Sequence, residues 1–384
     1  MDENSLRSDK AGRMEWSDNG QFCYFMPNTL PLEIGTENFI GKSLRTVSGM
    51  SKLDGRISNI PYEERFVILN SFAIKEATAT SAIEGTRSTV SDIFKEEKER
   101  ETDAEKALDN QEVRNYKEAL LYAINAVSTE GMITEKIILS MHEILLRGAR
   151  GGKKLPGSYR NGQVWVGGRK DTLETAEFVP VPPFAIQYMM DDLVGYMNNK
   201  DEDPIRKMAV SHYQFETIHP FMDGNGRIGR LILMLLAYEE GIMDNPFLYV
   251  SEYFNRYRDE YIRCLMKVRT DGDLAGWMEF LIDALDAQTK VSSELLASLS
   301  SYRNMMREFA VKERSKGLDA VCGMLIENPF ITVNDVIKRT GVSAPTARKL
   351  LTILVAEGIL DVVEGKRKGV LYKATVILDM LENS

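Results

Sequence analysis

Cysteine, histidine and long apolar runs are all scarce in this sequence. It has 3 cysteines, with neither paired nor metal-ligand spacing, and 3 histidines. So few cysteines argue against a disulfide framework and fit a reducing compartment. No stretch approaches the ~20 apolar residues of a membrane span, and residues 1–4 lack the basic and apolar regions of a signal peptide. We therefore expect a cytoplasmic protein with no membrane partner.

An excess of positive charge is also missing. The net charge of −9 over 384 residues argues against a main body that binds nucleic acid nonspecifically. The sequence is 43% hydrophobic and 27% charged, which is ordinary for a folded globular protein. Its length exceeds one comfortable hydrophobic core, so two or three domains are expected.

Residues 219 to 230 read His-Pro-Phe-Met-Asp-Gly-Asn-Gly-Arg-Ile-Gly-Arg and combine residue types suited to phosphate chemistry. His219 can accept a proton near neutral pH, and Asp223 offers oxygen ligands to Mg²⁺. Gly224-Asn225-Gly226 lets backbone N–H groups approach an anion, at the positive end of the helix expected to follow. The two arginines, three positions apart, share one helical face. The string predicts a nucleotide-triphosphate site with a base beside it.

This string is similar, at every fixed position, to the Fic (Fic/Doc) family signature His-x-Phe-x-Asp/Glu-Gly-Asn-Gly-Arg-x-x-Arg. The resemblance implies transfer of AMP from ATP, with Mg²⁺, to a hydroxyl side chain of a target protein, which can be the protein itself. It implies that His219 is the general base and that Asp223 binds the metal. The nucleotide-binding residues in the motif would be Gly224, Asn225, Gly226, Arg227, Gly229 and Arg230. The other histidines, His142 and His212, lie in apolar helical contexts and are expected to pack or cap.

Residues 80 to 85, Thr-Ser-Ala-Ile-Glu-Gly, resemble the inhibitory motif of the same family, Ser/Thr-x-x-x-Glu-Gly/Asn. The resemblance implies an ion pair between Glu84 and Arg230, in the place that the γ-phosphate needs. A carboxylate and a phosphate would compete for one guanidinium, and ATP would bind misaligned for in-line attack. Glu84 could also activate water, so that the enzyme removes AMP as well.

Two further regions resemble parts of Fic proteins. Short β-branched and aromatic runs within residues 157 to 183 predict a hairpin. In the family a hairpin here is a flap that aligns the target by strand pairing, which would use Val164, Trp165 and Val166. A hairpin that only covers a core edge is compatible with the same residues. Downstream, Asn255 and Tyr261 match positions near the nucleotide, but Ile262 replaces a second tyrosine.

Helical patterning dominates the chain and predicts a mainly α fold: a Fic-type helical core with a small β-hairpin flap, plus a C-terminal winged helix-turn-helix. We expect a polar, poorly ordered segment over 1–24, an N-terminal helical region with the inhibitory motif over 25–109, and the Fic core over 110–310. The winged helix-turn-helix is expected over 318–384. A homodimer is a family-level expectation.

The C-terminal unit should have Ser343 to Glu357 as its recognition helix and 364–369 as its wing tip. Residues 318–384 contain eight Lys or Arg and eight Asp or Glu, whereas a DNA reader usually has a basic footprint. Some basic residues cluster, however, at Arg348, Lys349 and 366–368. DNA contact and a docking or dimerising role therefore both remain open.

Two functions of different classes follow from these motifs. One is a self-inhibited protein adenylyltransferase. The other is a DNA-binding transcriptional regulator that uses the Fic core as a nucleotide or partner sensor. An intact base at His219 favours the enzyme, because a pure sensor has no need of one.

Overall fold

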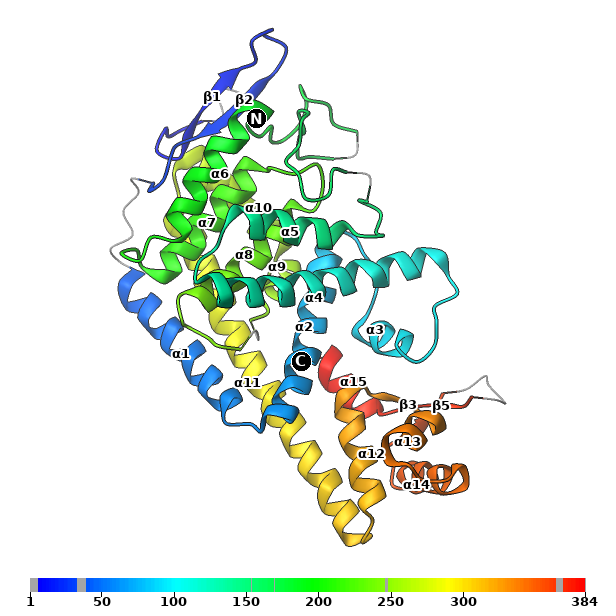
Figure 1. Cartoon of the computed structure of the whole chain (residues 1–384). Coiled ribbons are helices and arrows are strands. Elements are labelled where there is room, and N and C mark those ends of the chain that lie inside the picture. The colour runs from blue at the N-terminus through cyan, green and yellow to red at the C-terminus, as the bar shows by residue number, and fades with distance from the viewer. Residues whose placement is uncertain are drawn as a thin grey trace.

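The computed structural model describes residues 6–32, 39–152, 154–168, 170–245, 248–363 and 369–383, and helices dominate them (Figure 1). The N-terminal region and core contain α1 (Ile40–Ser58), α2 (Tyr62–Ile83), α3 (Val90–Glu96), α4 (Ala104–Glu130), α5 (Glu135–Leu146), α6 (Pro183–Met197), α7 (Pro204–Ile218), α8 (Asn225–Glu239), α9 (Val250–Arg256), α10 (Arg258–Asp271) and α11 (Leu274–Lys312). No helix among these described residues is long and apolar enough to cross a membrane.

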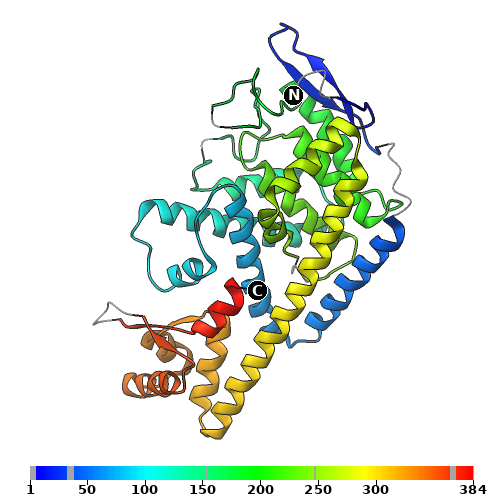
Figure 2. The same ribbon diagram turned by 180° about the vertical axis from the view of Figure 1, so that it is seen from behind.

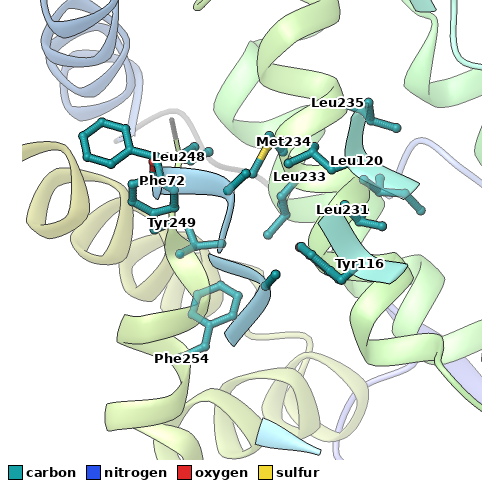
Figure 3. Close-up of a cluster of buried hydrophobic side chains, with 14 of the residues drawn as sticks. Phe72, Tyr116, Leu120, Leu231, Leu233, Met234, Leu235, Leu248, Tyr249 and Phe254 are labelled. Atoms are coloured by element: carbon teal, nitrogen blue, oxygen red, sulfur yellow. The ribbon is translucent and has the colours of Figure 1, made fainter. Parts of the chain in front are cut away.

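The core forms around α7 and α8, whose residues are almost all buried. The apolar run after the phosphate string, Leu231 to Ala237, lies entirely inside. Figure 3 shows why: α8 side chains meet Phe72 from α2 and Tyr116 from α4 in one cluster. Burying large side chains from three helices stabilises their arrangement. The core thereby fixes the helix of the expected inhibitory motif against the helix of the phosphate motif.

The N-terminal segment differs from its prediction. Residues 12–27 form an antiparallel hairpin of β1 (Gly12–Trp16) and β2 (Cys23–Pro27), so the expectation of a poorly ordered segment up to residue 24 is wrong there. The last four residues of β2 are all buried, and Phe25 lies in the core against the ring of Phe178. The N–H of Phe25 also donates to the carbonyl of Val179 (2.9 Å). The polar composition of residues 1–24 did not indicate these strands, because a few apolar residues and tertiary contacts stabilise them.

The expected flap is an extended loop pair rather than a full hairpin. Val166 and Phe178 form one antiparallel bridge, exchanging hydrogen bonds of 2.8 and 3.1 Å. Between them, residues 170 and 173–175 lie in turns. One bridge needs little regular alternation, which explains why the sequence overstated the strand content here.

The C-terminal part folds into α12 (Lys316–Glu327), β3 (Phe330–Thr332), α13 (Val333–Thr340), α14 (Ala344–Ala356), β4 (Asp361–Val362), β5 (Leu371–Lys373) and α15 (Thr375–Glu382). The three strands make one antiparallel sheet in the order β3-β5-β4. Thr332 caps α13 in a capping box: its side chain accepts from the N–H of Asp335, and the Asp335 side chain accepts from the N–H of Thr332. The predicted wing tip, 364–369, lies outside the described residues except for its last position. Both views place this unit beneath the core, where α15 lies beside α2 (Figures 1 and 2).

Candidate active site

His219 stands at the turn between α7 and α8. It is the C-cap residue of α7, with φ 50° and ψ 59°, and its N–H donates to the carbonyl of Phe215 (2.9 Å). Burial, together with the nearby charges of Arg160 and Arg269, lowers the pKa of the His219 imidazole to about 4. The ring is therefore neutral at neutral pH and able to accept a proton.

The next residues expose the positive end of α8. Gly224 has φ 81°, where a side chain would be strained, and it is the N-cap residue. The first helical residue, Asn225, turns its side chain back onto Phe221, accepting from its N–H (2.8 Å) and donating to its carbonyl (2.9 Å). Within the described residues no side chain caps α8. Its first-turn N–H groups are thus available to an anion, while the Asn225 side chain shapes the loop.

His142 holds this loop in place from α5. One ring nitrogen lies 3.0 Å from the carbonyl of Asp223, and the other accepts from the N–H of Gly157 (3.1 Å). The ring stacks on Phe221 at 3.7 Å. Burial lowers the pKa of His142 to about 4, which suits a neutral ring that donates on one side and accepts on the other. The expected packing and capping role is confirmed for His142.

Glu84 and Arg230 meet in the same place. Glu84 follows the last residue of α2, and its Oε1 lies 2.7 Å from Nη2 of Arg230. Thr80, one turn earlier, accepts from Arg230 through its hydroxyl (2.6 Å) and its carbonyl (3.2 Å). Although burial alone would raise it, the pKa of Glu84 is lowered by the charge of Arg230. The Arg230 side chain is 1% exposed and that of Glu84 is 39% exposed, so the carboxylate closes the site from its open side.

Asp223 and Arg227 lie on the other side of the loop. Arg227 pairs with Oδ1 of Asp223 at 3.4 Å and with Glu112 at 3.7 Å, both looser than a charge-assisted hydrogen bond. The Asp223 side chain remains 40% exposed. Its carboxylate is therefore accessible to a cation from solvent.

A cavity of about 180 Å³ opens beside these residues. Its lining includes four residues of the two motifs: Glu84, His219, Gly226 and Arg230. The sequence did not single out several of its other lining residues: Ile83, Phe178, Glu216, Arg258, Leu265 and Arg269. Glu216 lies in α7, three residues before His219, and Arg269 lies in α10; no local pattern in the sequence marks either of them as a site residue. Burial raises the pKa of the Glu216 carboxyl to about 7.

The two downstream site predictions have different outcomes. Tyr261 lines the cavity, buried, with its hydroxyl 2.7 Å from Nε2 of His212. His212 in turn contacts the carbonyl of Gly229 at 3.0 Å, which confirms its structural role. Asn255 is exposed near the end of α9 and does not line the cavity. The structure therefore does not bring Asn255 into the site, because it lies on the solvent face of its helix.

The expected flap lies over the cavity. Val166 lines it, Trp165 is 43% exposed, and Val164 is half-buried. Arg160 joins the base of the flap to the catalytic turn: its guanidinium donates to the carbonyls of His219 (2.8 Å), Gly162 (3.1 Å) and Val181.

Comparison with known proteins agrees with this geometry. Residues 132–237 match the Fic/DOC family, and residues 46–125 match the Fic/DOC family N-terminal region. A probable protein adenylyltransferase of Aquifex aeolicus is 27% identical over 58% of this chain and 70% of its own length. The protein adenylyltransferase Fic of Aedes aegypti is 30% identical over 46% of this chain.

Solved structures share the fold. A Fic family protein from Desulfovibrio desulfuricans superposes with a TM-score of 0.55 at 22% identity, covering 89% of this chain and 97% of that one. Fic-1 of Caenorhabditis elegans gives a TM-score of 0.53 at 21% identity, covering 67% of this chain and 73% of that one. Residues 46–125 and 132–237 are thus similar in sequence to the Fic/DOC family, and the fold is shared with solved Fic proteins. The chain spans only 34% of the length of the mosquito relative.

Proposed function

We propose that this protein is a self-inhibited protein adenylyltransferase. It is a nucleotidyltransferase that moves AMP from ATP to a serine, threonine or tyrosine hydroxyl of a protein and releases pyrophosphate. The observation that carries the proposal is the position of Glu84, which pairs with Arg230 at an uncapped helix N-terminus beside a neutral histidine. Such an enzyme needs a base, an anion site and an inhibitory carboxylate that can leave that site.

In the reaction the target hydroxyl attacks the α-phosphorus of ATP. A bond forms between the hydroxyl oxygen and that phosphorus, and the bond from the phosphorus to the bridging oxygen of the β-phosphate breaks. Neutral His219 accepts the hydroxyl proton. The first-turn N–H groups of α8 and the buried guanidinium of Arg227 stabilise the charge that develops on phosphate oxygens. No covalent enzyme intermediate is needed.

Asp223 fits a magnesium ion. No cluster of three or more His, Cys, Asp or Glu ligands occurs among the described residues, so a cage made of protein alone is not found there. Mg²⁺ is usually held by one or two carboxylates together with substrate phosphates, and Asp223 supplies one accessible carboxylate. Bound there, the ion would neutralise phosphate charge. His142 holds the Asp223 carbonyl, so the carboxylate is presented from a fixed loop.

Glu84 would inhibit by taking the place of a phosphate. Its Oε1 lies beside Gly226 in the first turn of α8 as well as beside Arg230. Two anions cannot share that guanidinium, so ATP would enter with its phosphates misaligned. The remaining cavity of about 180 Å³ is also smaller than common ligand pockets of roughly 300 Å³ or more.

The outer parts would select and regulate. The edge formed by half-buried Val164 and by exposed Trp165 and Val166 would align the target by backbone pairing. The helix pair α13–α14 with the sheet β3-β5-β4 supports the winged helix-turn-helix, in which α14 would be the recognition helix.

Self-labelling with α-labelled ATP and Mg²⁺ tests the proposal. We expect weak label in the wild type, strong label in Glu84→Gly, and none in Glu84→Gly/His219→Ala. Glu84→Gln, which keeps the bulk of the side chain but removes its charge, is the matched control and should label at an intermediate level. ATP binding without label in any variant would instead support the regulator that uses its Fic core as a sensor.

A further inference from the structure

The C-terminal unit contacts the chain just before Glu84. The ammonium of Lys75, in α2, donates to the backbone carbonyl of Leu381 in α15 (3.2 Å) and pairs with Glu252 at 3.1 Å. The Lys75 side chain is buried, so this contact is shielded from water. Leu381 is itself buried at the junction. A buried ammonium that donates to a carbonyl of the other unit fixes the two helices relative to each other.

A second set of contacts follows Glu84 in sequence. Glu382 of α15 accepts from the N–H of Ser91 at the start of α3 (3.0 Å). Asn328, after α12, donates to the carbonyl of Phe94 (3.0 Å) and to the carboxylate of Glu97 (2.8 Å). The C-terminal unit therefore contacts the chain both before and after Glu84 in the sequence.

Between these two sets of contacts, the position of the chain that carries Glu84 is restricted. Lys75 and Thr80 belong to one continuous helix that ends at Ile83, so the place of α15 on α2 sets the place of Glu84. Glu76 fixes the rotation of that helix, accepting from the N–H of Ser251 (3.2 Å) and from the hydroxyl of Tyr116 (3.3 Å). Both ribbon views show α15 against α2 (Figures 1 and 2).

We propose that residues 316–383 act as a clamp that holds Glu84 in the anion site, and that loosening this junction releases AMP transfer. The inference rests on the proposed function. The junction combines these polar contacts with apolar packing of α12 on α2 and α11 and of α15 on α2 and α3. Opening it would be a local event that costs less free energy than global unfolding. Arg348 and Lys349 are exposed residues of α14. The helix α14 lies away from α2 (Figure 1). A ligand of that face which prefers the open junction would shift the population toward the active form.

Two substitutions loosen the junction with little other change. Asn328→Asp removes the donor to Phe94 and repels Glu97, yet keeps the Oδ1 that accepts from the N–H of Phe330. Glu382→Ala removes the acceptor for Ser91. The matched control is Asp379→Ala, which removes an exposed acid from the same helix α15.

Self-labelling of the full chain tests whether the C-terminal unit holds Glu84 in the anion site. Asn328→Asp/Glu382→Ala should label roughly 5- to 150-fold more than wild type, the usual range of coupling between sites. In a Glu84→Gly background the same two substitutions should not raise labelling further, because the inhibitory carboxylate is already absent. Asp379→Ala should match the wild type. Strong label in Glu84→Gly with no gain in the junction variant, or an equal gain in both backgrounds, overturns the clamp.

Hydrogen exchange gives a second reading that does not depend on catalysis. Amides of residues 80–88 should exchange faster in the junction variant than in wild type or Asp379→Ala, and unchanged exchange overturns the clamp. If Glu84→Gly does not label at all, the proposed function is wrong, and exchange alone then decides whether the junction holds this segment.

Discussion

Oε1 of Glu84 lies so close to the backbone of Gly226 that a Cβ added to Gly226 would come within 2.5 Å of it. The same Cβ would lie 2.9 Å from Nη1 of Arg230. A side chain at position 226 would therefore have to displace the Glu84 carboxylate and the Arg230 guanidinium, which form an ion pair. This close approach ties the inhibitory residue directly to the first turn of α8.

Gly226→Ala should destabilise the wild type by about 1–3 kcal/mol, the usual cost of overpacking. In a Glu84→Gly background the cost should be smaller, because the nearest clashing atom is gone. Denaturant unfolding of the four proteins measures the difference. Gly55→Ala, at an open position within α1, is the control and should be neutral or slightly stabilising. An equal cost in both backgrounds would show that Glu84 does not occupy this place.

Gly229 should show a similar dependence on Glu216. A Cβ at Gly229 would lie 2.3 Å from Oε1 of Glu216 and 3.3 Å from the His212 ring. Gly229→Ala should therefore destabilise the protein, and Glu216→Ala should relieve part of that loss. A double-mutant cycle should give a coupling of about 0.5–3 kcal/mol. Combining Gly229→Ala with Asp379→Ala, in the distant C-terminal unit, should be additive, and additivity with Glu216→Ala as well would contradict the prediction.

How far the sequence predicted the site depends on how local each feature is. The string from His219 to Arg230 is one turn and one helix, so its residues come together by local geometry alone. The pairing of Glu84 with Arg230 joins distant segments, and only the family resemblance predicted it. Arg160 and Glu216 act through contacts that tertiary packing creates. Asn255 was placed by sequence position, which does not say which face of a helix points to solvent.

The fold shows the same division. Helical periodicity predicted a mainly helical fold, and the side chains of Asp103 and Thr134 cap the starts of α4 and α5. The N-terminal hairpin was missed because Phe25 and its neighbours are stabilised by the 178–179 segment, far along the chain. Short strands depend on such partners more than helices do.

In Glu84→Gly, His219 should remain neutral and able to act as the base at acidic pH. Burial lowers the pKa of His219 to about 4, so the neutral imidazole persists as pH falls to that value. An ordinary histidine, with a pKa of ~6.5, would be roughly nine-tenths protonated at pH 5.5. Labelling rates at saturating ATP should therefore not fall tenfold between pH 7.5 and 5.5.

Glu216 needs a control, because burial raises its pKa to about 7, within the same range. Any shallow change in rate near pH 7 should disappear in Glu84→Gly/Glu216→Gln. A tenfold fall centred near 6.5 in both variants would instead assign an ordinary pKa to the base.

Arg160 should matter for target alignment more than for nucleotide binding. Its guanidinium satisfies carbonyls at the base of the flap, Gly162 and Val181, and in the catalytic turn, at His219. In a Glu84→Gly background, Arg160→Ala should lower labelling of a protein target by about tenfold or more, because a small misplacement of reacting groups costs that much. ATP affinity should change less, since the first turn of α8 is untouched. Arg160→Lys should not restore the rate, because one ammonium cannot match a planar guanidinium that donates to four carbonyls. Full rescue by lysine, or an equal loss of ATP binding, would show that Arg160 serves the nucleotide through its charge.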